Sequence, residues 1–310
     1  MAPVIEKIRE LGCFELGEGP HWDNESQSLY WVDIVKKTIH KYIPSLKKHT
    51  HIKVDKFPSL IVPISGSSDR FIITLQREVA VLTWDGVSSR PTSIETIAIV
   101  DTDNALKNNR INDGKVDPLG NLWAGTMAID GDTPYGPRTG TLFCLSSNKK
   151  IRYFEENVGI SNGLAWSSDL KKMYYIDSVK RRIDQYDFDA TNASITNRQP
   201  LFSLEKHNIP GFPDGQTIDA DGNLWVAVFR GKRVIKVSSA KPETLLDTVN
   251  IPDLQITSVA FGGPLLDELY VTSASHIAWP TEGEEDCIKG HIYKITGLGV
   301  RGLPANRIKI

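Results

Sequence analysis

Four short phrases in the chain place an oxygen-bearing side chain next to a glycine. They are Glu18-Gly19-Pro20, Asn112-Asp113-Gly114, Asn162-Gly163-Leu164 and Asp214-Gly215-Gln216. Carboxylate and amide oxygens, with no cysteine or paired histidine nearby, form a hard donor set that suits Ca²⁺, Mg²⁺ or Mn²⁺. Any one of these pairs alone is also typical of an ordinary turn. A metal site therefore depends on a fold that brings several of them together.

The elements that carry these phrases repeat along the chain. The phrases belong to a longer unit that occurs six times. In each unit a first strand-like run is followed by a second, apolar run, and these second runs begin at residues 29, 71, 122, 173, 224 and 269. The clearest copy has a turn at Asp221-Gly222-Asn223 and then the strand-like run Leu224 to Val228. Units made only of strands with a period of roughly 40–50 residues are typical of a β-propeller. The sequence predicts an all-β fold, a six-bladed β-propeller.

The first strand of each propeller blade lines the central channel, so equivalent positions should face one another at one depth. The residues that open the predicted first strands are Glu18, Asn112 or Asp113, Asn162, Asp214 and Ser258, with Leu60 as an apolar exception. Glu18, Asn162 and Asp214 should thus converge as ligands of one divalent metal ion. Three protein ligands leave positions open for water or substrate, as a catalytic metal needs.

The segment from Asn109 to Lys115 holds more polar groups than a turn requires. Arg110 can form bidentate hydrogen bonds to an anionic or hydroxyl-rich ligand. Asn112 can orient a substrate or a water molecule. We expect both residues to lie in a polar loop beside the channel and to bind substrate rather than support folding.

Bulk properties narrow the class of protein. The chain has 310 residues, a net charge of −2 and three cysteines without paired spacing. This charge argues against a nucleic-acid partner, and the cysteine pattern suggests a reducing compartment. We find no signal pattern and no apolar run that would span a membrane, so we expect a cytoplasmic, monomeric protein. Residues 1–310 are predicted to form one domain, closed by pairing of terminal strands at 4–11 and 291–296.

A set of blocks resembles the gluconolactonase/regucalcin (senescence marker protein) family over essentially the whole chain. The blocks are Glu18-Gly19-Pro20, Arg110 to Lys115, Gly125-Thr126-Met127, Ser161 to Leu164 and Pro213-Asp214-Gly215. The resemblance implies a six-bladed propeller with a divalent metal in its channel, Ca²⁺ first and Mg²⁺, Mn²⁺ or Zn²⁺ as alternatives. It places the metal ligands at Glu18, Asn162 and Asp214. It also implies substrate contacts at Arg110 and Asn112, and at Asp130, where sugar-lactone members carry Glu.

Further stretches resemble the luciferin-regenerating branch of that family. They are Leu82 to Ser88, Gly163 to Ser178 and Gly215 to Phe229. This resemblance implies a small-molecule substrate, oxyluciferin, converted to 2-cyano-6-hydroxybenzothiazole, with D-cysteine as the downstream reactant. Asp214 would also act as the catalytic base that holds or deprotonates water. Two alternatives stay open, a sugar-lactone hydrolase and a non-enzymatic calcium-binding protein.

Overall fold

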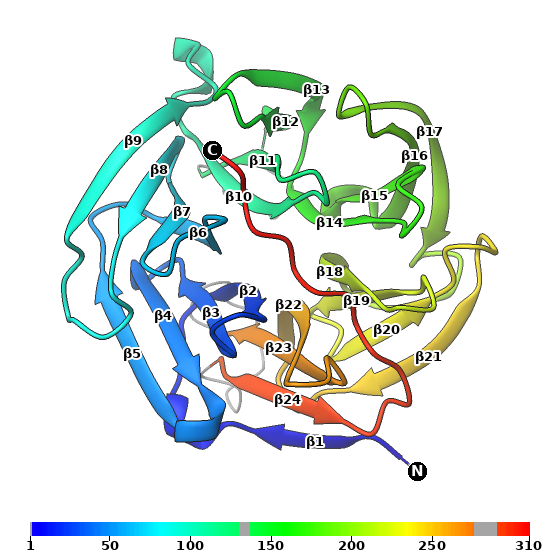
Figure 1. Cartoon of the computed structure of the whole chain (residues 1–310). Helices are drawn as coiled ribbons and strands as arrows, with labels where there is room; N and C mark the ends of the chain where they lie inside the picture. The colour runs from blue at the N-terminus through cyan, green and yellow to red at the C-terminus, as the bar shows by residue number, and fades with distance from the viewer. Residues whose placement is uncertain (1, 130–136, 276–289) are drawn as a thin grey trace.

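Six small antiparallel sheets stand around a central axis like the blades of a propeller (Figure 1). The structure is a computed structural model that describes residues 2–129, 137–275 and 290–310. Each sheet has four strands, and the innermost strand of each blade contacts the innermost strands of its neighbours. The predicted six-bladed β-propeller is confirmed.

The strands of the first three blades follow chain order from the axis outwards. Blade 1 consists of β2 (Gly17–Asp23), β3 (Ser28–Asp33), β4 (Thr38–Ile43) and β5 (Lys48–Lys53). Blade 2 consists of β6 (Pro58–Pro63), β7 (Arg70–Leu75), β8 (Glu78–Thr83) and β9 (Ser93–Ile99). Blade 3 consists of β10 (Asn109–Val116), β11 (Leu122–Ala128), β12 (Gly140–Leu145) and β13 (Ile151–Val158).

The other three blades close the ring. Blade 4 consists of β14 (Ser161–Trp166), β15 (Lys172–Asp177), β16 (Arg182–Asp189) and β17 (Ser194–Ser203). Blade 5 consists of β18 (Phe212–Ile218), β19 (Leu224–Phe229), β20 (Arg233–Val237) and β21 (Leu245–Asn250). Blade 6 consists of β22 (Gln255–Gly262), β23 (Glu268–Ala274), β24 (Ile292–Thr296) and β1 (Val4–Lys7). Blade 6 thus joins both ends of the chain, as the sequence predicted.

The helical content of the described residues is limited to four single 3₁₀ turns. These are η1 (Arg9–Leu11), η2 (Pro44–Leu46), η3 (Asn104–Leu106) and η4 (Ser178–Lys180). No helix in the described ranges is long and apolar enough to cross a membrane.

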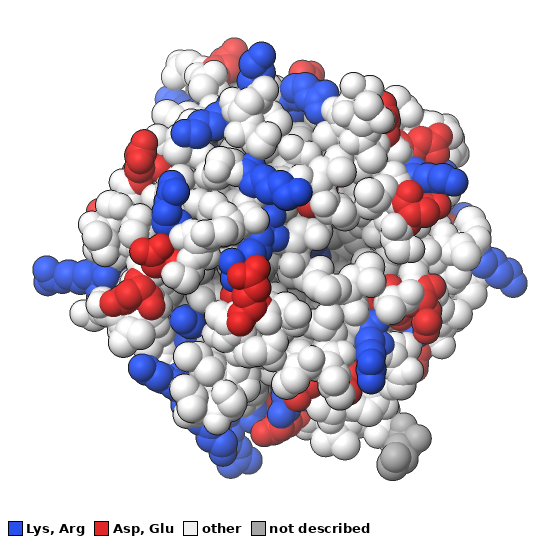
Figure 2. Space-filling view, viewed as in Figure 1, with Lys and Arg blue, Asp and Glu red and all other residues white. Residues whose placement is uncertain are grey.

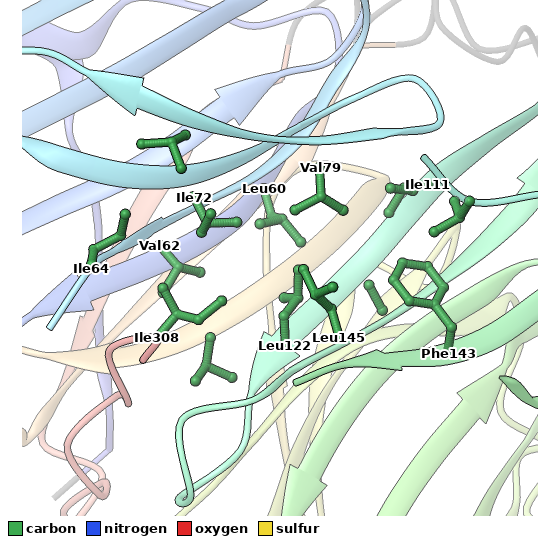
Figure 3. Close-up of a cluster of buried hydrophobic side chains, with 14 residues drawn as sticks. Leu60, Val62, Ile64, Ile72, Val79, Ile111, Leu122, Phe143, Leu145 and Ile308 are labelled. Atoms are coloured by element: carbon green, nitrogen blue, oxygen red, sulfur yellow. The ribbon is translucent and has the colours of Figure 1, made fainter. Parts of the chain in front are cut away.

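The hydrophobic core lies between the blades rather than at the axis. Six clusters of buried apolar side chains fill the interfaces between neighbouring sheets. In the cluster between blades 2 and 3, Val62 and Ile72 of blade 2 face Leu122 and Leu145 of blade 3 (Figure 3). Because every blade buries both faces in this way, the ring holds the inner strands at fixed distances from the axis.

The C-terminal segment crosses one face of the ring, from blade 6 to the neighbourhood of blades 2 and 3 (Figure 1). Gly302 forms a bridge with Asp219 in blade 5, and Ile308 forms one with Ile64 beside blade 2. Arg307 holds the segment through hydrogen bonds of 2.8 and 2.9 Å to the carboxylate of Asp23. Basic and acidic side chains are interspersed over this face (Figure 2). Among the described residues, the pocket lined by Glu18 and Asp214 includes none from this C-terminal segment.

The structure corrects three local predictions. Asp214 lies inside β18 instead of preceding the first strand of its blade. Arg110 lies inside β10 and not in a loop, because the predicted loop after Asn104 ends at Asn108. The N-terminal strand stops at Lys7, and residues 9–11 form the 3₁₀ turn η1.

Glycine beside a channel residue allows neighbouring inner strands to approach closely. A Cβ atom built on Gly215 would lie 2.0 Å from Oγ and 2.8 Å from Cα of Ser258 in the next blade. Gly163 would place its Cβ 2.7 Å from the carbonyl oxygen of Asp214. The glycines of these phrases thus serve strand packing at the axis, in addition to any turn.

We expect Gly215→Ala to destabilise the protein by about 1–3 kcal/mol, because overpacking forces the backbone of β22 to shift. Thermal unfolding monitored by circular dichroism measures this loss. Gly17→Ala is the matched control, because Gly17 also lies in an inner strand without a positive φ, and its added Cβ would come no closer than 3.1 Å to a neighbouring atom. Equal melting temperatures for the two variants would contradict the packing argument.

Candidate active site

A bulge in every inner strand turns the candidate residues towards the axis. The strand register shifts between Glu18 and His21 in blade 1, and between Pro213 and Gln216 in blade 5. The same irregularity occurs between Asn162 and Leu164 in blade 4. The remaining inner strands, β6, β10 and β22, carry theirs at the corresponding place. Bulges re-aim side chains and interrupt pairing, so these six bulges build one polar layer in the channel.

Five of the six predicted site residues line a single pocket in this layer. They are Glu18, Arg110, Asn112, Asn162 and Asp214. The sixth, Asp130, lies outside the described residues. Of the two alternatives in blade 3, Asn112 lies in the pocket wall, whereas Asp113 is buried nearby beside Lys115. The structure therefore brings residues from four blades to one place.

Hydrogen bonds fix the two amide side chains. Asn112 donates from Nδ2 to the carbonyl oxygen of Ser161 (2.8 Å) and to Oδ1 of Asn162 (3.2 Å). Asn162 donates from Nδ2 to Oγ of Ser178 (2.8 Å), and Ser178 donates to the carbonyl oxygen of Pro213 (2.7 Å). With Nδ2 engaged by Ser178, the amide oxygen Oδ1, which also accepts from Asn112, is the atom of Asn162 that could bind a cation.

The electrostatics of the pocket disfavour negative charge on its carboxylates. Burial, then the charge of Asp113, raises the pKa of Glu18 to about 8. The pKa of Asp214 is raised well above its usual range, first by burial and then by Glu18 and Asp113. Burial lowers the pKa of Arg110 to about 10, although Glu18 and Asp214 favour its charged form. Three buried carboxylates thus face few compensating positive charges.

This donor set fits a divalent cation. Glu18 and Asp214 are 7% exposed and Asn162 is 4% exposed, so all three are largely withdrawn from water. Oδ1 of Asp214 has no hydrogen-bond partner among the described residues. A buried acceptor without a donor is costly unless a cation or water satisfies it. Two carboxylates and one amide oxygen are ligands that Ca²⁺ and Mg²⁺ accept.

Arg110 points its charge into the same pocket. Its Nη1 donates to the carbonyl oxygen of Ile111 at 3.1 Å, and within the described ranges it forms no ion pair within 4.0 Å. A half-buried guanidinium without a bound carboxylate retains donors for a ligand.

Sequence reasoning missed two parts of this site. One is Ser178 in η4, which orients Asn162; it ends the stretch Gly163 to Ser178, but nothing in that stretch predicted a role for it. The other is an apolar rim around the polar residues, formed by Leu16, Met127, Ile160, Phe212 and Phe229. These residues belong to blades 1, 3, 4 and 5 or to their edges and lie far apart in the sequence. No local sequence pattern therefore predicts that they share a pocket.

We expect Ser178→Ala to weaken divalent-cation binding by about 10–100-fold, because residues that orient metal ligands typically contribute this much. Isothermal titration calorimetry with Ca²⁺ measures the change, and Ser68→Ala on an exposed loop is the control. An affinity equal to that of the unmodified protein would show that Asn162 needs no such support.

Comparison with known proteins identifies the family. A model described as "SMP-30/Gluconolactonase/LRE-like region" matches residues 16–275. The chain belongs to this SMP-30/gluconolactonase family. Regucalcin of Gallus gallus is 39% identical over 306 residues, which cover 96% of this chain and 97% of that protein. Regucalcin of Homo sapiens is 37% identical over 304 residues, with 96% of each chain covered.

Solved structures of SMP-30/gluconolactonase proteins share the ring. A structure of luciferin-regenerating enzyme is 60% identical, with a TM-score of 0.97 and 100% of both chains covered. A calcium-binding protein, regucalcin, from Agrobacterium tumefaciens is 22% identical with a TM-score of 0.84, covering 98% of this chain and 97% of that one. The family resemblance inferred from the sequence is confirmed.

Proposed function

We propose that this protein is a metal-dependent hydrolase-like enzyme that converts oxyluciferin to 2-cyano-6-hydroxybenzothiazole, from which D-cysteine forms luciferin again. The observation that carries this proposal is that the pocket combines polar and apolar parts. The polar residues Glu18, Arg110, Asn112, Asn162 and Asp214 form its floor, and the apolar rim described above surrounds them. Phe212, Phe229 and Met127 offer flat or polarisable surfaces to an aromatic heterocycle. A sugar lactone, which carries hydroxyl groups all round, would find few partners on this rim. The 60% identity to luciferin-regenerating enzyme supports the same substrate.

The polar floor suits hydrolysis at a carbonyl carbon. A divalent cation held by Glu18, Asn162 and Asp214, Ca²⁺ first, would supply Lewis acidity in this floor when bound. Asp214 accepts a proton from the attacking water at a carboxylate oxygen and so acts as general base. Arg110 donates hydrogen bonds to the oxygen on which negative charge develops. Asn112 holds the water or the substrate through its amide.

The bond changes balance with one water molecule. Water adds to the ring carbonyl carbon of keto oxyluciferin, and the bond from this carbon to the ring nitrogen breaks. The proton taken up by Asp214 passes to that nitrogen, which leaves a carboxymethyl thioimidate. The bond between the imidate carbon and sulfur then breaks. The nitrogen gives its proton to the sulfur, so the nitrile and thioglycolate are released.

Turnover in ¹⁸O-labelled water tests the proposal. We expect one ¹⁸O atom in the carboxylate of released thioglycolate per turnover, after correction for exchange, and stoichiometric nitrile. Parallel assays with an aldonolactone on the same Ca²⁺-loaded preparation address the second candidate, a lactone hydrolase, which the polar floor alone would also serve. Hydrolysis of the lactone without nitrile formation would favour that candidate. Calcium binding without turnover of either compound would indicate a non-enzymatic calcium-binding protein.

A further inference from the structure

Three histidines lie together on the outer half of blade 1, remote from the channel layer. His40 belongs to β4, and His49 and His51 belong to β5. His40 pairs directly with His51 across the two strands, and His49 pairs with Tyr42. Because side chains alternate along a strand, His49 and His51 point to the same face. The register thus gathers three imidazoles on one surface of the sheet.

The ring nitrogens of these histidines approach one another closely. Nδ1 of His40 lies 3.0 Å from Nε2 of His49, and one nitrogen atom from each of the three residues lies within 4.8 Å of the others. The rings of His40 and His49 are inclined by 20° with centroids 5.2 Å apart, so they meet edge to edge at their nitrogens. Two in-plane lone-pair sites therefore converge, with a single proton between them.

A neighbouring hydroxyl can accept a hydrogen bond from the tautomer of His40 that a metal requires. Nε2 of His40 lies 2.7 Å from Oγ1 of Thr38. When this nitrogen carries the proton and donates to Thr38, Nδ1 is left with its lone pair towards His49. Metal-bound histidines usually donate their second ring nitrogen in this way, which fixes the ring and makes it a better ligand.

Burial favours the neutral form of His40 and His49. The pKa of His40 is well below its usual value, mainly through burial and then through His49, His51 and Lys36. Burial, followed by the charge of His51, lowers the pKa of His49 to about 4. His40 is held between Trp31, stacked at 4.9 Å, and Phe14 at 5.2 Å, whereas His51 is exposed and its ring lies 5.4 Å from that of His40. A buried ligand and an exposed one thus share the cluster.

We propose that His40, His49 and His51 form a second metal site that binds a borderline transition-metal ion such as Zn²⁺ or Cu²⁺. Zn²⁺–N bonds of about 2.0–2.1 Å in tetrahedral geometry require nitrogens slightly farther apart than the His40–His49 contact. A small rotation of His51 towards the pair completes three ligands and leaves a fourth position for water. The cation replaces the shared proton and ties β5 to β4 at the outer edge of blade 1. Imidazole donors select such ions over Ca²⁺, which prefers the oxygen set of the channel.

Cu²⁺ and Zn²⁺ titrations of the whole protein test this site, with excess Ca²⁺ present to occupy the oxygen ligands of the channel. Equilibrium dialysis is expected to give one Zn²⁺ per chain, and the electron paramagnetic resonance spectrum of bound Cu²⁺ is expected to show coupling to imidazole nitrogens. His49→Gln and His51→Gln should each weaken Zn²⁺ binding at least tenfold. Zn²⁺ should also raise the melting temperature of the unmodified protein but not of these variants.

His207→Gln is the matched control, because His207 stacks on Phe202 and lies 3.3 Å from Glu243 in a different blade interface. It should bind Zn²⁺ like the unmodified protein. His40 is buried, so the two more exposed histidines are chosen to avoid a folding defect. Equal Zn²⁺ affinity in all variants, or Cu²⁺ bound without nitrogen coupling, would overturn the proposal. Neither readout depends on turnover of any substrate.

Discussion

Asp214→Ala is expected to abolish stoichiometric binding of the channel cation and to lower kcat/KM by about 10²–10⁴-fold, the range for loss of a general base. Asp214 is the residue on which both roles depend. Its carboxylate is buried, and Oδ1 has no hydrogen-bond partner among the described residues. Elemental analysis after equilibration with Ca²⁺ measures the first effect, and nitrile formation from oxyluciferin measures the second.

The stability of the metal-free protein separates a binding defect from a folding defect. Removing one of several buried like charges should leave its melting temperature unchanged or raise it, because Glu18 and Asp214 oppose each other's ionisation. Ca²⁺ should then stabilise the unmodified protein but not the variant. Asp221→Ala, at an exposed turn of the same blade, is the control for loss of one acidic residue. Undiminished metal content in Asp214→Ala would refute the ligand assignment.

The second large effect is expected for Arg110→Ala, which should lower kcat/KM by more than about tenfold, some 1.4 kcal/mol. The guanidinium lies in the pocket wall, and its described hydrogen bond goes only to the carbonyl oxygen of Ile111. Its remaining donors are therefore available to a substrate oxygen in the transition state. Steady-state kinetics with oxyluciferin measures the loss, which we expect mainly in kcat.

Thermal stability should change little in Arg110→Ala, because burial already disfavours this charge and lowers the pKa of Arg110 to about 10. Arg70→Ala removes the same charge from an exposed strand end and should keep full activity. Full activity in Arg110→Ala, or unfolding of that variant at assay temperature, would contradict a role in substrate binding.

Much of the architecture follows from the sequence because blades are local units. Each apolar run after a turn, such as Leu224 to Val228, appears as a second strand within a residue or two of its predicted start. The turn at Asp219 forms because its carboxylate accepts from the backbone of Asn223 and from Nε1 of Trp225. Such contacts span few residues, so strand and turn patterns record them directly.

Convergence of Glu18, Asn162 and Asp214 could also be predicted, because equivalent positions of a closed repeat must meet at the axis. The prediction placed them at the openings of strands, whereas the structure places them at bulges inside β2, β14 and β18. A bulge has no strong sequence signal of its own, since it arises where neighbouring inner strands crowd the axis. Only the assembled ring decides where pairing is interrupted.

Tertiary structure alone decided the surroundings of the polar residues. Ser178 reaches Asn162 and Pro213 because η4 lies against β18, and the rim residues Phe212 and Met127 come from blades 5 and 3. His40 and His51 likewise meet only through the register of β4 and β5. The sequence alone determines the types of side chain and their positions within each repeat. Which side chains share a pocket depends on packing between blades, where each contact joins residues far apart in sequence.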